Sequence, residues 1–397
     1  MLRAAKTLYH LFVAVTAAIW YRFPSRKLVV IGVTGTDGKT TTTTLIYRIL
    51  MAAGYKVSMI SSVHAVIAGK EYDTGFHVTS PDPFPLQKYL REAVNYGDTH
   101  VVLEVTSHGL SQHRVFGIRF NVGVLTNITH EHLDWHGTYE EYLRMKLKLL
   151  IRSGTVVLNR DDAAVYNKIV RKLGKKKIIT YAIHRDALVT PHAFPFKTRL
   201  PGEYNKYNCL AAIAACLGLG IERKIMIAVI GAFEGIPGRM EIVATTPIQI
   251  VIDFAHTPNA IEQVLKTIRA GTKGRLIHVF GSAGERDASK RPMMGRASSR
   301  YSDLIVLTEE DPRSENAEDI MDQIQQGIQR SKQVLRYPSR TDAIVFAVGE
   351  AKPQDTVIIT GKGHEKSMCR GNVEYPWSDR DEANAALKLR MPYNQYV

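Results

Sequence analysis

A lysine and a run of threonines follow a glycine-rich turn in the segment GVTGTDGKTTT, residues 32–42. The apolar run KLVVIGV before the turn is typical of a buried strand, and Thr40 to Ala53 predict a helix closed by Gly54. A strand, a glycine turn and a helix N-terminus surround an anion with backbone N–H groups. We therefore predict a phosphate site in which Lys39 contacts the β- and γ-phosphates and the Thr40 hydroxyl binds Mg²⁺.

One position departs from the standard phosphate-loop spacing, GxxxxGK[ST]. That spacing requires a glycine at position 33, where this chain has Val33. The glycines at Gly35 and Gly38 still allow close backbone approach to a ligand. An ordinary turn would explain such a near-match by itself, but the strand before it and the helix after it favour a nucleotide site.

A carboxylate and a histidine form a second candidate site. Glu104 ends the apolar strand VVLEV, where an acidic side chain has little structural reason to lie, and His132 follows in THEHLDWH. Each residue lies near a strand end on the side of the phosphate loop, which suits a Mg²⁺ bound to phosphate. Zinc is the alternative, because His130, Glu131, Asp134 and His136 are close by, but the motif HExxH is absent.

Downstream, TYEE has the form of a capping box, with Thr138 as N-cap and Glu141 three residues later. The helix that begins there carries Lys146 and Lys148. By residue type alone, both are ordinary solvated helix lysines.

Composition limits the class of protein. The chain has 397 residues, enough for two or three domains, with 52 Lys and Arg against 38 Asp and Glu, a net charge of +14. This excess suits anionic partners, but no nucleic-acid-binding signature is present. The three cysteines form no CxxC pair, which fits a reducing cytoplasm.

The N-terminal run LYHLFVAVTAAIWY, Leu8 to Tyr21, is 14 residues long and mostly apolar. A membrane span needs about 20 residues, and a nucleotide site follows at once, so we expect a helix packed on the first domain rather than a span or a cleaved signal. The alternative is a helix on a membrane face, with Trp20, Arg22 and Arg26 at the boundary and residues 8–26 in peripheral contact.

Apolar strand-like runs alternate with helical stretches along the rest of the chain, as in HVVLEV, VGVLTNI and GTVVLN, and a second series begins near residue 247. This pattern predicts an α/β fold with mostly parallel sheets. We place the boundary in GIPGRMEIV. The expected parts are an N-terminal helix (1–26), a phosphate-loop domain (27–241) and a C-terminal domain (242–397).

The chain resembles the Mur ligase family, in its UDP-N-acetylmuramoyl-tripeptide synthetase branch, over roughly residues 28–385. The motifs that carry the resemblance occur in the family's order: GVTGTDGKTTT, EVTSHGLSQHRV, TNITHEHLDWHGTYEEY, LPGEYNKYNCLAA, GIPGRMEIV, VIDFAHTPNAIEQVL, VFGSAGERDASKRPMMG, DPRSE and TGKGHE. The resemblance implies a central ATP-binding domain, a Rossmann-like C-terminal domain and ATP-dependent amide formation through an acyl phosphate. ATP, two Mg²⁺ ions and small-molecule substrates in the cytoplasm are the expected partners, without nucleic acid.

The resemblance also implies roles for individual residues. The catalytic set is Lys39, Glu104, His132 and Lys146; Thr40, Glu104, His132 and a Lys146 carbamylated by CO₂ would hold Mg²⁺. The expected nucleotide contacts are Gly35, Thr36, Asp37, Gly38, Lys39, Thr40, Thr41, Asn127, Asn208, Arg239 and Asp253. The expected substrate contacts are Thr79, Ser80, Ser107, Gln112, Arg114, His256, Asp311, Arg313, Gly361 and Glu365.

The amine substrate is expected to be meso-diaminopimelate, because Arg313, Gly361 and Glu365 match the family's contacts with that amino acid. The family signature is DNPR, however, and this chain has Glu310 and Asp311 at the first two positions. The extra acidity favours a cationic side chain, so lysine is the alternative.

Members of this branch normally begin with a uridine-binding domain, and only about 30 residues precede the phosphate loop here. We therefore expect that domain to be missing, which leaves a non-muramoyl or lipid-linked wall peptide as an alternative acceptor. Another ligase of the superfamily, acting on folate or polyglutamate, a phosphate-loop ATPase without ligase activity and a non-catalytic scaffold are further rivals. SHGLSQHR and DPRSE argue against folate, and an ATPase would leave GKGHE unexplained.

Overall fold

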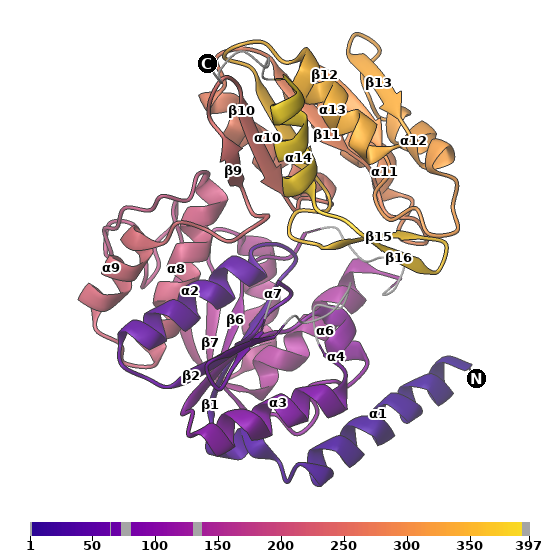
Figure 1. The fold of residues 1–397 in the computed structure, drawn as a ribbon. Helices are drawn as coiled ribbons and strands as arrows, with labels where there is room; N and C mark the ends of the chain where they lie inside the picture. The colour runs from indigo at the N-terminus through magenta and orange to yellow at the C-terminus, as the bar shows by residue number, and fades with distance from the viewer. Residues whose placement is uncertain (1, 64, 73–80, 130–136, 391–397) are drawn as a thin grey trace. The chain divides into compact units, whose positions relative to one another are not determined.

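The computed structural model describes residues 2–63, 65–72, 81–129 and 137–390 (Figure 1). Contacts divide the chain into two compact units, residues 1–234 and 235–397. Each unit is built on one large sheet with mostly parallel strands, so the predicted α/β class is confirmed.

The sheet of the first unit has eight strands in the order β4-β3-β2-β5-β1-β6-β7-β8. From β2 to β8 the neighbours are parallel, and β3 and β4 join as antiparallel strands. The strands are β1 (Val29–Thr34), β2 (Val57–Ile60), β3 (Ala65–Ile67), β4 (Lys70–Tyr72), β5 (His100–Glu104), β6 (Phe120–Leu125), β7 (Ser153–Asn159) and β8 (Lys177–Tyr181).

Helices of the first unit follow the strands that they connect. They are α1 (Leu2–Trp20), α2 (Lys39–Ala52), α3 (Pro83–Tyr96), α4 (Ser107–Ser111), α6 (Tyr139–Arg152), α7 (Ala163–Leu173), α8 (Glu203–Gly218) and α9 (Arg223–Ala232), with a short 3₁₀ turn η1 (Pro24–Lys27). The central strand β1 is buried along five of its six residues, which explains its unbroken apolar sequence. Ten of the sixteen residues of helix α8 are buried, and its Cys209 and Cys216 have no exposed surface.

The sheet of the second unit has the order β13-β12-β11-β14-β10-β9, parallel except for the edge strand β9. Its elements are β9 (Glu241–Ala244), β10 (Gln249–Asp253), α10 (Pro258–Gly271), β11 (Leu276–Phe280), α11 (Lys290–Tyr301), β12 (Leu304–Thr308), α12 (Ala317–Gln325), β13 (Gln333–Tyr337), α13 (Arg340–Glu350), β14 (Thr356–Thr360) and α14 (Asp379–Arg390). A small antiparallel hairpin, β15 (Ser367–Arg370) and β16 (Val373–Pro376), follows β14 and contains the buried Cys369.

In open sheets of this kind, ligands bind beyond the carboxyl ends of the parallel strands. In the first unit, β1, β5 and β6 are neighbours, so Thr34, Glu104 and Leu125 end at the same edge. The phosphate loop follows β1 at that edge, and its position explains why the candidate residues, far apart in sequence, can meet.

Candidate functional site

The glycine-rich loop connects β1 directly to α2, as the sequence predicted, and Gly38 is the residue before the helix. Gly38 has φ of +78°, a left-handed conformation that favours glycine. A Cβ atom there would lie 2.1 Å from Oδ1 of Asn208. The loop therefore requires glycine at this position for its conformation and for the approach of α8.

Residues that follow β6 hold the loop in shape. The backbone N–H of Thr36 donates to the carbonyl of Asn127 (3.0 Å), and that of Asp37 donates to Asn127 Oδ1 (2.9 Å). The Thr126 hydroxyl donates to the Asp37 carbonyl at 2.7 Å. Asn127 was predicted as a nucleotide contact; here it binds the loop itself.

Lys39 and Thr41 lie in the first turn of α2. The Lys39 ammonium donates to the carbonyl of Thr36 at 2.6 Å, so the side chain folds back over the loop. The Thr36 hydroxyl lies 3.0 Å from the Tyr142 hydroxyl and accepts from the N–H of Thr129. A cation beside a glycine-rich loop at a helix N-terminus is an arrangement that stabilises a bound phosphate.

Glu104 is 1% exposed at the end of β5 and forms a cluster with two hydroxyl groups. Its Oε2 accepts from the Thr40 hydroxyl (3.0 Å) and from the backbone N–H of Ser62 (3.0 Å). The Ser62 hydroxyl lies 2.9 Å from that of Thr40. A carboxylate and hydroxyl oxygens are the ligands that Mg²⁺ prefers, so Thr40 and Glu104 fit a magnesium site.

Ser62 was not predicted from the sequence. It follows the neighbouring strand β2, and β2 pairs with β5. In the sequence, the only indication was that Ser62 lies just beyond the end of a strand. The order of strands in the sheet was needed to predict that this strand end lies beside Glu104.

His132, the other predicted metal ligand, lies outside the described residues, as do Thr79, Ser80 and the remaining members of the zinc alternative. Within the ranges that the structure describes, no group of three or more His, Cys, Asp or Glu side chains is placed to hold a metal ion.

The two lysines of α6 differ sharply in environment. Thr138 caps the helix by accepting from the N–H of Glu141 at 3.2 Å, which confirms the predicted capping residue. Lys146 is 1% exposed, donates to the carbonyl of Gly35 at 2.7 Å and lies over the Tyr142 ring. Lys148 is half-buried. The expectation that Lys146 is solvated by default is therefore wrong: its ammonium contacts the phosphate loop.

Helix α8 places Asn208 next to Gly38 of the loop. Its Nδ2 donates to Asn205 Oδ1 at 3.0 Å, and Asn205 in turn donates to the carbonyl of Pro201. Both asparagines are buried. This chain of bonds fixes the Asn208 amide next to Gly38.

The residues predicted to bind the carboxylate substrate lie around α4. Ser107 is buried in its first turn, while Gln112 and Arg114 follow its end. Arg114 donates to Gln112 Oε1 at 2.8 Å and pairs with Asp82 at 3.2 Å. These contacts hold the Arg114 guanidinium in place.

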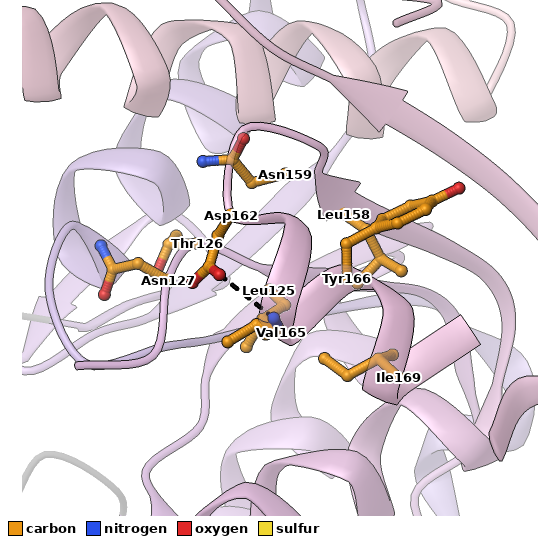
Figure 2. A pocket seen from close by; sticks show the side chains of 9 residues that line it. All are labelled: Leu125, Thr126, Asn127, Leu158, Asn159, Asp162, Val165, Tyr166 and Ile169. Carbon is orange, nitrogen blue, oxygen red and sulfur yellow. Dashed lines mark hydrogen bonds between the residues drawn. The ribbon is translucent and has the colours of Figure 1, made fainter. Parts of the chain in front are cut away.

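A small pocket lies beside the segment that holds the phosphate loop (Figure 2). Asn127 and Asp162 lie at its polar side, and Val165 and Ile169 of α7 form its apolar wall. The lining residues are Leu125, Thr126, Asn127, Leu158, Asn159, Asp162, Val165, Tyr166 and Ile169. The pocket therefore adjoins the carboxyl ends of β6 and β7.

In the second unit, Asp253 ends β10 and organises the neighbouring backbone. Its two carboxylate oxygens accept from the N–H groups of Met240 and Ala255, each at 2.7 Å. Burial raises the pKa of this carboxyl, and the nearby Arg239 opposes the shift. The Arg239 guanidinium lies 4.4 Å from the centre of the Phe254 ring.

His256 follows on the same loop. Its Nδ1 lies 2.8 Å from the carbonyl of Phe254, and its own carbonyl accepts from the Lys290 ammonium at 2.9 Å. The N–H of Gly361 donates to the carbonyl of Asp253, which joins this loop to the end of β14. Arg239, Asp253, His256 and Gly361 thus belong to one neighbourhood of the second unit.

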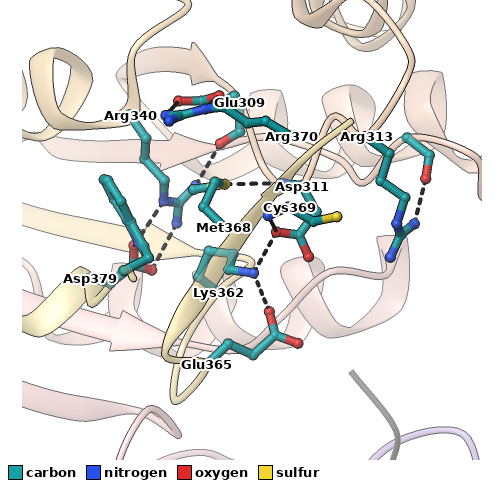
Figure 3. A network of polar contacts seen from close by, with 12 residues as sticks. Glu309, Asp311, Arg313, Arg340, Lys362, Glu365, Met368, Cys369, Arg370 and Asp379 are labelled. Atoms are coloured by element: carbon teal, nitrogen blue, oxygen red, sulfur yellow. Dashed lines mark hydrogen bonds and ion pairs between the residues drawn. The ribbon is translucent and has the colours of Figure 1, made fainter. Parts of the chain in front are cut away.

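A second neighbourhood contains the residues expected to select the amine (Figure 3). Lys362 has no exposed surface, and its ammonium lies 2.7 Å from Asp311 Oδ1 and 2.5 Å from Glu365. The N–H of Cys369 also donates to Asp311 Oδ1, at 2.9 Å. Glu309 is paired with Arg370. Lys362 was missed by sequence reasoning although it lies within the quoted motif TGKGHE.

The segment around Asp311 has a strained backbone. Asp311 and Arg313 have φ of +43° and +52°, which is unfavourable for residues with a Cβ atom. The β15–β16 hairpin holds Arg313 in this conformation: its N–H donates to Cys369, and its carbonyl accepts from Gly371. Strain of this kind persists where surrounding contacts impose it, and it is concentrated at functional sites.

Arg313 is half-buried, and its Nη1 donates to the carbonyl of Gly284 at 2.6 Å. In the described part of the chain it forms no ion pair. Glu310, in contrast, is buried against Gly361, where a Cβ would lie 2.2 Å from Glu310 Oε2, and burial raises the pKa of Glu310.

Comparison with known proteins gives the family. The model of the Mur ligase middle domain matches residues 33–216, and that of the Mur ligase glutamate ligase domain matches residues 238–363. A UDP-N-acetylmuramoyl-L-alanyl-D-glutamate–2,6-diaminopimelate ligase of Aquifex aeolicus is 40% identical over 90% of this chain and 77% of its own. The ligase of the same name from Geobacillus kaustophilus is 36% identical over 95% of this chain and 82% of its own.

Solved structures agree. A 2,6-diaminopimelate ligase of the same full name is 30% identical, with a TM-score of 0.60 over 91% of this chain and 79% of its own. The fold also matches that of E. coli FolC in complex with DHPP and ADP, at 22% identity and a TM-score of 0.71 over 87% of this chain and 88% of FolC. The chain therefore belongs to the Mur ligase family and is an ATP-dependent ligase that joins an amino acid to a carboxylate.

Proposed function

We propose that this ligase adds meso-diaminopimelate to the carboxylate of UDP-N-acetylmuramoyl-L-alanyl-D-glutamate, with cleavage of ATP to ADP and phosphate. The relatives that carry this activity in their names are 36–40% identical over most of the chain. The observation that carries the choice of amine is Arg313, which has no carboxylate partner among the described residues. A guanidinium in this position suits the distal carboxylate of diaminopimelate, which lysine lacks.

The acidic residues that would favour lysine are already paired with cations of the second unit. Asp311 is paired with Lys362, and Glu309 is paired with Arg370. Glu310 is buried, with its pKa raised by burial. Glu309 and Asp311 therefore each have a cation beside them already, although Glu365 shares Lys362 with Asp311.

In the first unit, the loop from Gly35 to Thr41 would hold the ATP phosphates. The Lys39 ammonium would stabilise charge on the transferred phosphoryl group, because phosphoryl transfer depends mainly on positioning and charge neutralisation. Thr40 and Glu104 would hold Mg²⁺, which neutralises phosphate charge when bound, and His132 is proposed as a further ligand. Arg114, with Ser107, Gln112, Thr79 and Ser80, would orient the acceptor carboxylate.

We propose the remaining nucleotide contacts for Asn208 in the first unit and for Arg239 and Asp253 in the second. His256, Gly361 and Glu365 would contact the amino acid. The functional domains would correspond to residues 27–241 and 242–397. The reaction is proposed to take place in the cytoplasm.

We also propose that Lys146 is carbamylated in the active enzyme and that the carbamate helps to hold a second Mg²⁺. The supporting observation is that Lys146 is buried and lies 2.7 Å from the carbonyl of Gly35, within the phosphate loop. The modification would replace a cation with an anion at this point.

The test is incubation of the protein with ATP, Mg²⁺ and the muramoyl dipeptide, with diaminopimelate or lysine offered in parallel. Mass spectrometry identifies the product, and ADP release is followed alongside. We expect the diaminopimelate adduct only, and no adduct from Lys39→Ala. Arg313→Met should raise KM for diaminopimelate, whereas the matched control Arg330→Met, at an exposed arginine, should not.

A lysine adduct would keep the reaction and contradict the role of Arg313. ADP release that requires no acceptor would favour the ATPase alternative. ADP release with a lipid-linked or non-muramoyl peptide alone would reassign the acceptor.

A further inference from the structure

Helix α1 has large apolar side chains on the face turned away from the protein. Leu8, Phe12, Val15 and Ile19 recur at helical spacing and form one stripe. Leu8, Phe12 and Ile19 are 69%, 69% and 59% exposed, and Trp20 is 73% exposed. We call the stripe, with the neighbouring Tyr9 and Trp20, the outer face of α1.

The opposite face of the helix packs against the first unit. Ala14, Ala17 and Ala18 are buried, and α1 packs along α3 (Figure 1). Beyond the helix, Phe23 and Ala18 lie against Gly117, and Arg91 of α3 donates to the carbonyl of Tyr21. The small residues therefore fix α1 to the domain, while the large ones are left outside.

This distribution is the reverse of that on an ordinary surface helix, which places its large apolar residues inward and polar residues outward. A contiguous exposed stripe of this kind marks an interaction surface. Of the described helices, none is long and apolar enough to cross a bilayer. A helix that is fixed along its length by one face can, however, place the other face in the plane of a membrane.

Charge around the helix indicates the type of partner. The first 36 residues contain five Lys and Arg and no Asp or Glu. Of these cations, Lys6 lies in the first turns, and Arg22, Arg26 and Lys27 follow the end of the helix; all four are exposed.

More positive charge lies beside the helix. Burial lowers the pKa of His113, and the electrostatic effects of Lys148 and Arg152 of α6 and of His10 of α1 lower it further. A basic surface next to exposed Trp, Tyr, Phe and Leu side chains matches an anionic bilayer, where aromatic rings lie at the headgroup level and cations contact lipid phosphates.

We propose that α1 binds an anionic lipid bilayer through its outer face, with the flanking cations against the headgroups. The enzyme would then work at the membrane surface. Binding is independent of the proposed reaction, because the outer face contains none of the residues assigned to substrates.

The experiment measures binding of the whole protein to phosphatidylcholine vesicles with and without phosphatidylglycerol, by flotation and by Trp20 fluorescence. We expect binding to the anionic vesicles, a blue shift that is lost in Trp20→Phe, and weakening by salt above about 0.1 M, where charges are screened beyond about 10 Å. The variant Phe12→Glu/Ile19→Glu should lower the apparent affinity at least about tenfold, because two buried apolar contacts are lost.

Leu188→Glu is the matched control, since Leu188 is 56% exposed in the same unit but far from α1 in sequence. It should bind like the unmodified protein, and both variants should keep the far-ultraviolet circular dichroism and the ADP release of the unmodified protein. Equal binding of the double variant, or equal binding to vesicles without phosphatidylglycerol, would overturn the proposal. A dimer by light scattering that the double variant abolishes would instead assign the outer face to a second copy of the chain.

Discussion

The buried ammonium of Lys362 provides a stringent test of how the second unit holds its amine-selecting residues. Replacing Lys362 with methionine keeps most of the side-chain volume and removes the charge. Asp311 and Glu365 then remain without their cation, and Asp311 is only 4% exposed.

The expected cost follows from the geometry. With Nζ–O distances of 2.7 and 2.5 Å, each carboxylate attracts the ammonium by about 6 kcal/mol at an effective dielectric constant of about 20. Desolvation of the ammonium offsets much of this attraction, and removing one partner of a buried pair costs about 3–5 kcal/mol. Taking m as about 2 kcal/mol per M, the urea midpoint should fall by about 2 M.

Trp377 reports on this unit because its Nε1 donates to Asp379. In a Trp20→Phe/Trp135→Phe background its fluorescence follows unfolding of the second unit separately. Asp311→Asn in the Lys362→Met protein should restore about 1 kcal/mol or more, since it removes a buried charge that has lost the Lys362 ammonium. An unchanged midpoint for Lys362→Met, or strictly additive effects of the two substitutions, would refute the buried-pair reasoning.

Three further predictions concern the loop, the α6 lysine and a buried histidine. Gly38→Ala should weaken ATP binding and destabilise the first unit by about 1–3 kcal/mol, because the Cβ would lie 2.1 Å from Asn208; normal ATP affinity by calorimetry would contradict this. An arginine at position 146 can still donate to the Gly35 carbonyl but cannot be carbamylated. We expect loss of activity in both Lys146→Arg and Lys146→Ala, with partial rescue of the alanine variant by a small carboxylate. An active Lys146→Arg variant would exclude the carbamate. Burial lowers the pKa of His278 from 6.5 to about 3. Its contribution to the free energy of unfolding is therefore present above pH 6.5 and is lost as the pH falls toward 3, by up to about 1.4 kcal/mol per pH unit. Urea titrations between pH 7 and 5 should show this slope, and the slope should be smaller in His278→Gln.

Local features of the phosphate loop could be predicted from sequence because they depend on neighbouring residues. The apolar run before Gly35 predicted β1, and the helix after Gly38 begins at Lys39, one residue before the expected start. The N-cap at Thr138 could be predicted for the same reason, because its hydrogen bond joins residues only three positions apart.

Contacts between distant segments could not be predicted by this reasoning. Ser62 meets Glu104 because β2 and β5 are neighbours in the sheet, and Lys362 meets Asp311 across 51 positions. A lone lysine gives no local signal that it is buried, which is why Lys146 was expected in solvent. The proposed choice of amine rests on such pairings, and a count of acidic residues in the sequence does not show them.

The three cysteines have a practical consequence for measuring dynamics. Cys209 and Cys216 are completely enclosed in α8 of the first unit, Cys369 is 8% exposed in β15 of the second, and burial raises the pKa of all three thiols, that of Cys209 to about 12. In the folded protein, burial and the raised pKa values therefore slow the reaction of all three thiols with an alkylating reagent. Each unit thus contains a native reporter of its own opening. The rate at which its thiols become alkylated measures how often that unit opens, without any engineered label.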